Sequence, residues 1–134
     1  MHLDYAFICD YAEARDKVNA IGIGFDRIFA PSLPARHRHF SVVLQLRFSS
    51  TETGNKPVDI HLIDADGLDV IPPINGNLDV KAPPPGLLAV SARMVMEFGN
   101  VEFKNYGSYS VKVNLQNTEI VSIPITVAQP PKTA

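Results

Sequence analysis

The sequence has little cysteine, no tryptophan, no surplus of positive charge and no long hydrophobic run. Cys9 is the single cysteine, which excludes an internal disulfide, and its apolar surroundings predict a buried, unreactive thiol. Twelve lysines and arginines against 14 aspartates and glutamates give a net charge of −2, which argues against nucleic-acid binding. Without a signal-peptide pattern after Met1 or an apolar run long enough for a membrane span, we expect a cytoplasmic protein with no membrane partner.

Length and composition indicate one globular domain. The chain has 134 residues, of which 46% are hydrophobic, and this is enough to form a core without a structural metal. We therefore expect a single domain over residues 1–128. Residues 129–134, which include Pro130 and Pro131, are expected to form a flexible tail.

Short runs of alternating apolar and polar residues, separated by proline and glycine, predict β-strands. The clearest runs are 3–9, 40–48, 58–62, 88–98, 111–115 and 121–127. The turn at 64–67 predicts a hairpin that returns through 68–71, Gly99-Asn100 is expected to end the strand before it, and 116–118 predicts a second hairpin. Residues 11–17 are interpreted as one helical turn or a polar loop, and Pro124 predicts a strand at a sheet edge or bulge.

Seven or eight short strands without intervening helices indicate an all-β fold, specifically a two-sheet antiparallel β-sandwich of immunoglobulin-like or related topology. The segment from Asn105 to Val111 resembles the tyrosine corner that opens a late strand in immunoglobulin-like domains. The cysteine pair and buried tryptophan of antibody domains are absent.

Nearly the whole chain resembles a family of small uncharacterised bacterial all-β proteins. The resemblance rests on Asp4-Tyr5-Ala6, Cys9-Asp10-Tyr11-Ala12, Ile21-Gly22-Ile23-Gly24-Phe25-Asp26, His61-Leu62-Ile63-Asp64-Ala65-Asp66-Gly67 and Glu97-Phe98-Gly99-Asn100-Val101. It implies a bacterial β-sandwich and no assigned activity.

The most basic segment is Arg36-His37-Arg38-His39. Arginine forms paired hydrogen bonds with phosphate and carboxylate groups, so this segment is a candidate anion-binding site. A solvated basic loop on the surface is the alternative interpretation.

Histidines and aspartates also suggest metal chemistry. His37 and His39 are two residues apart and can share one strand face, and His61 and Asp64 are the nearest candidate partners for a small hydrolase or metal-dependent enzyme. Asp64, Asp66 and Asp69 suggest calcium, but an Asp-Gly turn explains the same residues. Arg27 stands where a dinucleotide loop needs its third glycine after Gly22-Ile23-Gly24. We therefore expect neither a metal nor a cofactor.

The preferred hypothesis is a non-catalytic binding or assembly module. Its partner is expected to be a second copy of the chain, in a homodimer, or a different protein. Several strands are apolar on both faces where an isolated sandwich needs one apolar face, which predicts self-association. The residues expected to contribute are Leu87, Ala89, Val95, Ile120 and Pro124.

Overall fold

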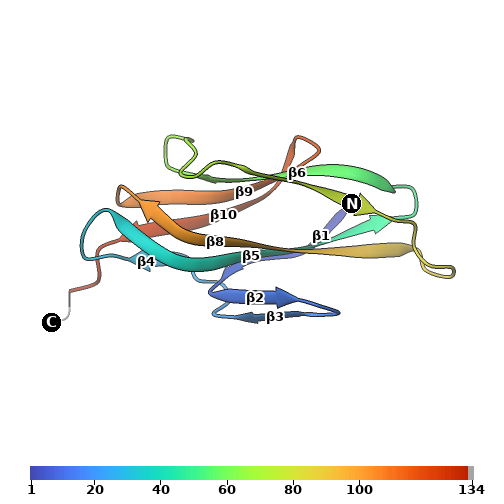
Figure 1. The fold of residues 1–134 in the computed structure, drawn as a ribbon, viewed down its shortest axis with the longest axis horizontal. Coiled ribbons are helices and arrows are strands. Elements are labelled where there is room, and N and C mark those ends of the chain that lie inside the picture. The colour runs from blue at the N-terminus through green and yellow to red at the C-terminus, as the bar shows by residue number, and fades with distance from the viewer. Residues whose placement is uncertain (133–134) are drawn as a thin grey trace.

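The computed structural model describes residues 1–132, which form β-strands and no helix (Figure 1). The all-β fold class is therefore confirmed. The strands are β1 (His2–Cys9), β2 (Tyr11–Ala14), β3 (Val18–Ile21), β4 (Arg27–Phe29), β5 (Ala35–Ser49), β6 (Gly54–Ile63), β7 (Ile74–Val80), β8 (Ala89–Phe103), β9 (Gly107–Leu115) and β10 (Thr118–Ala128).

The strands form two larger sheets and one small one. The first has the order β1-β5-β8, the second β4-β10-β9-β6-β7, and the third is the β2–β3 pair. Neighbouring strands are antiparallel except β4 and β10, which pair in parallel through Arg27–Phe29 and Thr126–Ala128. The expectation of antiparallel pairing throughout is wrong at this point, because β4 and β10 are separated by five other strands in the chain and are not joined by a hairpin.

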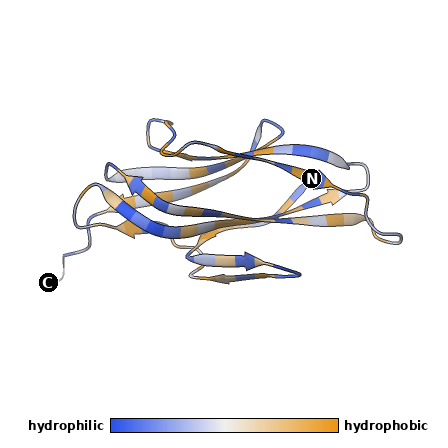
Figure 2. Ribbon diagram, viewed as in Figure 1, coloured by the Kyte–Doolittle hydropathy of each residue, from blue (hydrophilic) through white to orange (hydrophobic). Residues whose placement is uncertain are grey.

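Both larger sheets contribute to one apolar core. Phe40 and Leu44 of β5 and Val113 of β9 are fully buried there, and the Phe40 and Phe98 rings stack with centroids 4.8 Å apart. Colouring by hydropathy shows the alternation along the strands that places these residues, with hydrophilic residues gathered at the start of β5 (Figure 2).

The C-terminal hairpin forms as predicted. Gln116 and Asn117, with φ of 50° and 65°, make a two-residue turn between β9 and β10, the geometry whose twist matches that of the flanking strands. Pro124 lies opposite Ser110 of β9, while β4 pairs only with Thr126–Ala128. Among residues 1–132, no strand therefore pairs with the other side of β10 at Pro124, although β10 as a whole is not an edge strand.

Two strand predictions are corrected. A turn closes at 64–67, where the Gly67 amide donates to the Asp64 carbonyl, and the chain returns antiparallel as predicted. The return makes only one bridge, between Ile63 and Asp69, so 68–71 is not a strand, and β6 pairs with β7 and β9. Likewise, β8 does not end at Gly99-Asn100. It continues to Phe103, with Asn100 at a φ of 51°, because β5 pairs with it on both sides of that position.

Of the segment 11–17, interpreted as a helical turn or a polar loop, residues 11–14 are strand and residues 15–17 form the turn that follows. Residues 11–21 form the β2–β3 hairpin, which projects beneath the three-stranded sheet (Figure 1). Ala12 of the hairpin packs with Cys9 and Val43 in a second apolar cluster on the outer side of that sheet. The predicted burial of Cys9 is confirmed, and burial raises the pKa of its thiol.

The chain after β10 is exposed and outside any strand over residues 129–132. Positions 133 and 134 of the expected tail lie outside the described residues. None of the described residues belongs to a helix that could cross a membrane.

Candidate functional site

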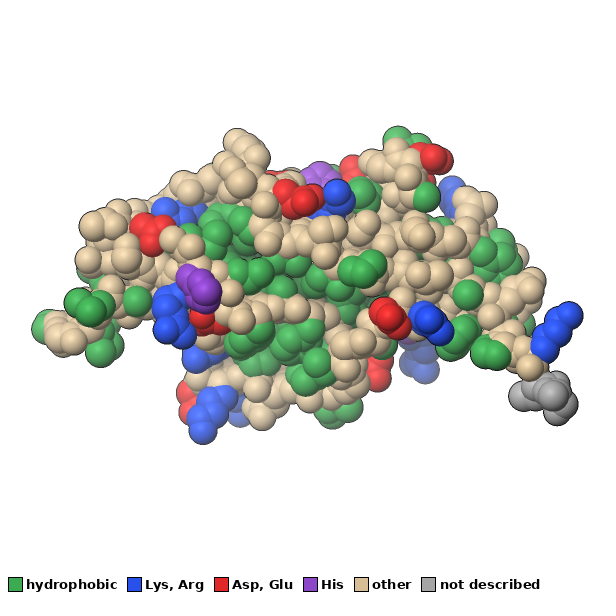
Figure 3. All heavy atoms as spheres, turned by 180° about the vertical axis from the view of Figure 1, so that it is seen from behind, with side chains coloured by type: hydrophobic (Ala, Val, Ile, Leu, Met, Phe, Trp, Pro, Cys, Tyr) green, Lys and Arg blue, Asp and Glu red, His purple; other side chains and the backbone are tan. Residues whose placement is uncertain are grey.

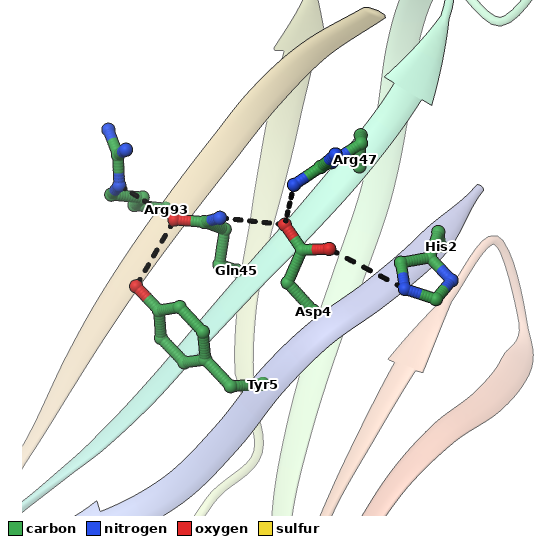
Figure 4. Close-up of polar contacts among 6 residues, drawn as sticks. All are labelled: His2, Asp4, Tyr5, Gln45, Arg47 and Arg93. Carbon is green, nitrogen blue, oxygen red and sulfur yellow. Dashed lines mark hydrogen bonds and ion pairs between the residues drawn. The ribbon is translucent and has the colours of Figure 1, made fainter.

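A polar network joins the three strands on the outer face of the β1-β5-β8 sheet (Figure 4). Asp4 accepts hydrogen bonds from the side chains of Gln45 at 2.7 Å and Arg47 at 3.1 Å. The oxygen of the Gln45 amide in turn accepts from the Tyr5 hydroxyl at 3.2 Å and from Arg93 at 2.8 Å. The hydrogen bond from Gln45 lowers the pKa of Asp4 most, and Arg47 lowers it further, so the carboxylate form holds this network together.

The remaining part of that outer face is apolar and lies against the β2–β3 hairpin. Val43 is fully buried beneath the hairpin, and Arg93 also donates to the carbonyl of Asp16 in the hairpin turn at 3.3 Å. A groove of about 420 Å³ runs between β1 and β3, lined by Tyr5, Phe7, Val18, Asn19, Ala20 and Ile23. Seen from behind, hydrophobic side chains gather in the middle of the molecule (Figure 3).

The edge of β8 is the longest open edge in the structure. β5 pairs with β8 from Ala89 to Phe103, and in residues 1–132 no strand pairs with the opposite edge. Arg93, Val95 and Glu97 alternate along it and therefore share the outer face. A hollow of about 430 Å³ separates β8 from β2, lined by Tyr11, Ala12, Glu13, Ala14, Val95 and Glu97.

The candidate anion-binding residues lie at the start of β5 with separate partners. Arg36 pairs with Glu102 of β8 at 3.3 Å, and His39 donates from Nδ1 to the carbonyl of Asp10 at 2.9 Å. His37 lies against the Phe25 and Phe40 rings, and its burial lowers its pKa, which favours the uncharged imidazole. Arg38 is exposed and makes no side-chain contact of this kind among residues 1–132. Anion binding at Arg36, His37, Arg38 and His39 stays a prediction.

His61 is engaged elsewhere, on β6 of the five-stranded sheet. Its Nδ1 lies 2.8 Å from an Asp69 carboxylate oxygen and its Nε2 lies 2.7 Å from one of Asp59, which also accepts from Asn114 at 2.9 Å. The hydrogen bond to Asp69 raises the pKa of His61 most, with Asp59 adding to it. Two carboxylates therefore stabilise the doubly protonated ring.

The residues of the proposed enzyme site are thus divided between two sheets. His37 and His39 are on β5, whereas His61 is on β6 and Asp64 is in the turn after it. The Asp64 carboxylate accepts the amides of Asp66 and Leu68 at 2.9 and 3.0 Å, as a turn residue does. Within residues 1–132, no three His, Cys, Asp or Glu side chains are arranged to hold a metal ion.

A shallow pocket of about 190 Å³ adjoins that turn. It is lined by Asp64, Leu68, Asp69, Val70, Glu102, Lys104, Asn105 and Tyr109. Buried Tyr109 donates from its hydroxyl to the Asn105 carbonyl at 2.7 Å, which fixes the β8–β9 connection. Three acidic residues and one lysine thus line the pocket.

The residues predicted for self-association lie on different surfaces. Ala89 begins β8, Leu87 is exposed just before it, and Val95 is half-buried against the hairpin. Ile120 and Pro124 belong to β10 in the other sheet. The five residues do not share one sheet face.

Sequence reasoning missed Arg93 and Glu97, which flank Val95 on the edge strand. The sequence contains a signal for them, because a positive residue and a negative residue lie at equal distances on either side of Val95. When two copies of such a segment run antiparallel, each positive residue faces a negative one. This charge pattern indicates a strand contact only when β8 is known to have an unpaired edge.

The described residues thus define an all-β protein with one shared core, an added hairpin and an open 15-residue edge strand. The chain belongs to DUF6941, a family of unknown function, whose sequence model matches residues 4–128. Among curated proteins, none matches the chain.

Proposed function

We propose that the protein is a non-catalytic assembly module that self-associates through the edge of its three-stranded sheet. The observation that carries this proposal is the open edge of β8, Ala89–Phe103, which presents unpaired backbone N–H and C=O groups to another strand.

The other edges are less suited to strand pairing. β4 has three residues and β7 has seven, with exposed Asn75, Gly76 and Asn77 in its middle. β1 has a register shift between Leu3 and Tyr5, which interrupts a regular ladder. β8 has no proline and keeps one register with β5 throughout.

We infer that the two larger sheets form an immunoglobulin-like β-sandwich. β1, β5 and β8 then correspond to strands A, B and E, and β6, β9 and β10 to strands C, F and G, with β7 beside β6 as in variable-type domains. The hydrogen bond from Tyr109 near the start of β9 to Asn105 supports this assignment, because it has the form of a tyrosine corner. An experimental structure with β1 and β9 in one sheet would contradict it.

This assignment gives a reason for the open edge. Constant-type domains place strand D beside strand E, and here the connection between β7 and β8 carries Pro83, Pro84 and Pro85 in that part of the chain. Proline has no N–H for a ladder, so this segment does not cover β8. A strand from a second molecule can occupy the place of strand D.

The alternative, a small hydrolase or metal-dependent enzyme using His37, His39, His61 and Asp64, has weaker support. Its residues lie on two sheets, and both ring nitrogens of His61 are bonded to carboxylates.

Sedimentation equilibrium combined with concentration-dependent hydrogen exchange tests the proposal. We expect a mass approaching twice the 14.7 kDa chain as concentration rises, together with slower exchange of β8 amides. The amides of β7, an edge strand of the other sheet, serve as the internal control and should not change. A constant monomer mass at high micromolar concentration would refute the proposal and favour a different protein as the partner.

A further inference from the structure

We infer that two copies of the chain pair antiparallel along β8, with the twofold axis passing beside Val95. This inference rests on the proposed function and specifies the register of the contact. The partner is a second copy of this chain, and the charges along β8 are what identify it.

The charges on the outer face of β8 are complementary when two copies of the strand run antiparallel. In an antiparallel pair centred on Val95, Val95 faces Val95 of the second copy, and Arg93 faces Glu97 on both sides of the axis. An axis at Arg93 or at Glu97 would place like charges directly opposite each other, and an axis at Met94 or at Met96 would place Arg93 or Glu97 opposite Val95. Only the axis at Val95 pairs Arg93 with Glu97, so charge complementarity favours this register.

The charged groups are available for this contact. Glu97 is exposed, and no hydrogen bond or ion pair of its carboxylate occurs in the described part of the chain. The hollow beside it contains a second carboxylate, Glu13, and no basic residue. Arg93 uses Nε and Nη1 for Gln45 and Asp16, which leaves Nη2 for the glutamate of the other copy.

Pairing along β8 would also cover apolar side chains on the core-facing side of the same edge. Val90, Ala92 and Met94 are only partly buried, although they pack against the main core. In the proposed register Met94 faces Met96 of the second copy, so pairing removes part of this apolar surface from water. The three-stranded sheets of the two copies would then form one continuous six-stranded sheet.

A cysteine placed on the twofold axis tests the register directly. Directly opposite residues have Cβ atoms about 4.5–5.5 Å apart, close to the range that a disulfide spans. Under mild oxidation we expect Val95→Cys to form a disulfide-linked dimer, whereas Ser91→Cys, on the same face, should not, because it faces Gly99 in the second copy. The native Cys9 is fully buried and does not compete. Equal crosslinking of both variants, or none with Val95→Cys, would overturn the register.

Charge reversal gives an independent measurement. We expect Glu97→Arg to weaken dimerisation roughly tenfold or more, because it creates like-charge pairs on both sides of the axis. Arg93→Glu should do the same, and the double variant Arg93→Glu/Glu97→Arg should restore dimerisation. Because Arg93 also holds the hairpin, thermal unfolding of each variant shows whether its monomer remains folded.

The outcomes distinguish the β8 register from self-association itself. A wild-type dimer that ignores these substitutions would overturn the β8 register and leave self-association intact. A wild-type protein that stays monomeric would overturn both.

Discussion

The outer faces of the two larger sheets are built in different ways. The five-stranded sheet presents polar side chains that pair among themselves, with His61 between Asp59 and Asp69 and with Lys112 bonded to Glu119 at 3.1 Å. Such a face is stable in contact with water. It needs no covering layer.

The three-stranded sheet is buried on both faces in its middle. Phe40, Val42 and Leu44 of β5 face the shared core, whereas Val43, also fully buried, faces the hairpin. A narrow sheet with apolar residues on both faces requires a second layer, which residues 11–21 supply. The same sheet also has the long open edge.

The largest expected effect comes from the core that both sheets share. Leu44→Ala should lower the free energy of unfolding by about 2–5 kcal/mol, because Leu44 is fully buried. Val113→Ala, in the other sheet, should cost about 1–3 kcal/mol and shift the same single transition in chemical denaturation. Separate transitions for the two variants would show that the sheets do not share one cooperative core.

A smaller effect is expected on the outer side of the three-stranded sheet. Val43→Ala should cost about 1–2 kcal/mol and should accelerate hydrogen exchange of the hairpin amides, because Val43 is the base on which the hairpin packs. Val42→Ala is the matched control, since it removes the same methyl groups from the opposite face. Equal acceleration of hairpin exchange by both variants would contradict the assignment of a separate outer cluster.

The pH dependence of stability should distinguish the five-stranded face. The pKa of His61 is raised in the folded state, so its contribution is fully present below the unfolded pKa of about 6.5 and is lost as pH rises through the folded value. We expect the free energy of unfolding to decrease across that interval and His61→Gln to remove the decrease. His39→Gln, on the other sheet, should preserve it. An unchanged slope in His61→Gln would show that the two carboxylates do not stabilise the protonated ring.

The smallest effect should come from the polar network on the three-stranded face. The pKa of Asp4 is lowered in the folded state, so its contribution is present above the unfolded pKa of about 3.8 and is lost as pH falls through the folded value. Acid titration of Asp4→Asn should therefore show a shallower loss of stability than the wild type does. Added salt should reduce the difference, because the Arg47 side chain is exposed. Identical acid profiles would indicate that the network contributes nothing measurable.

Short-range features of the fold were predictable from the sequence. The strand around Phe40–Phe48, the turn at Gln116-Asn117 and the burial of Cys9 all follow from alternation or turn chemistry, which involve neighbours along the chain. The return after Asp64 was predicted, but it makes one bridge to Ile63 rather than a strand, because a turn signal shows that the chain reverses and does not say how far the pairing continues.

The candidate site could be predicted only in part from the sequence. Val95 was singled out because it is apolar on an alternating strand, but Arg93 and Glu97 gained significance only from the open edge of β8. The enzyme hypothesis grouped His37 with His61 by residue type, and the structure placed them in different sheets with different partners.

By itself, the amino-acid sequence determined that this chain forms strands, where most of them run and which residues alternate toward a core. The tertiary structure alone decided the strand order, the parallel β4–β10 pair, the packing of the β2–β3 hairpin over Val43 and the open edge of β8. The physical reason is that alternation is set by backbone geometry within a few residues. Strand pairing depends on contacts between segments that are distant in the chain. Which pairing is the most stable is therefore decided by the packing of the whole fold.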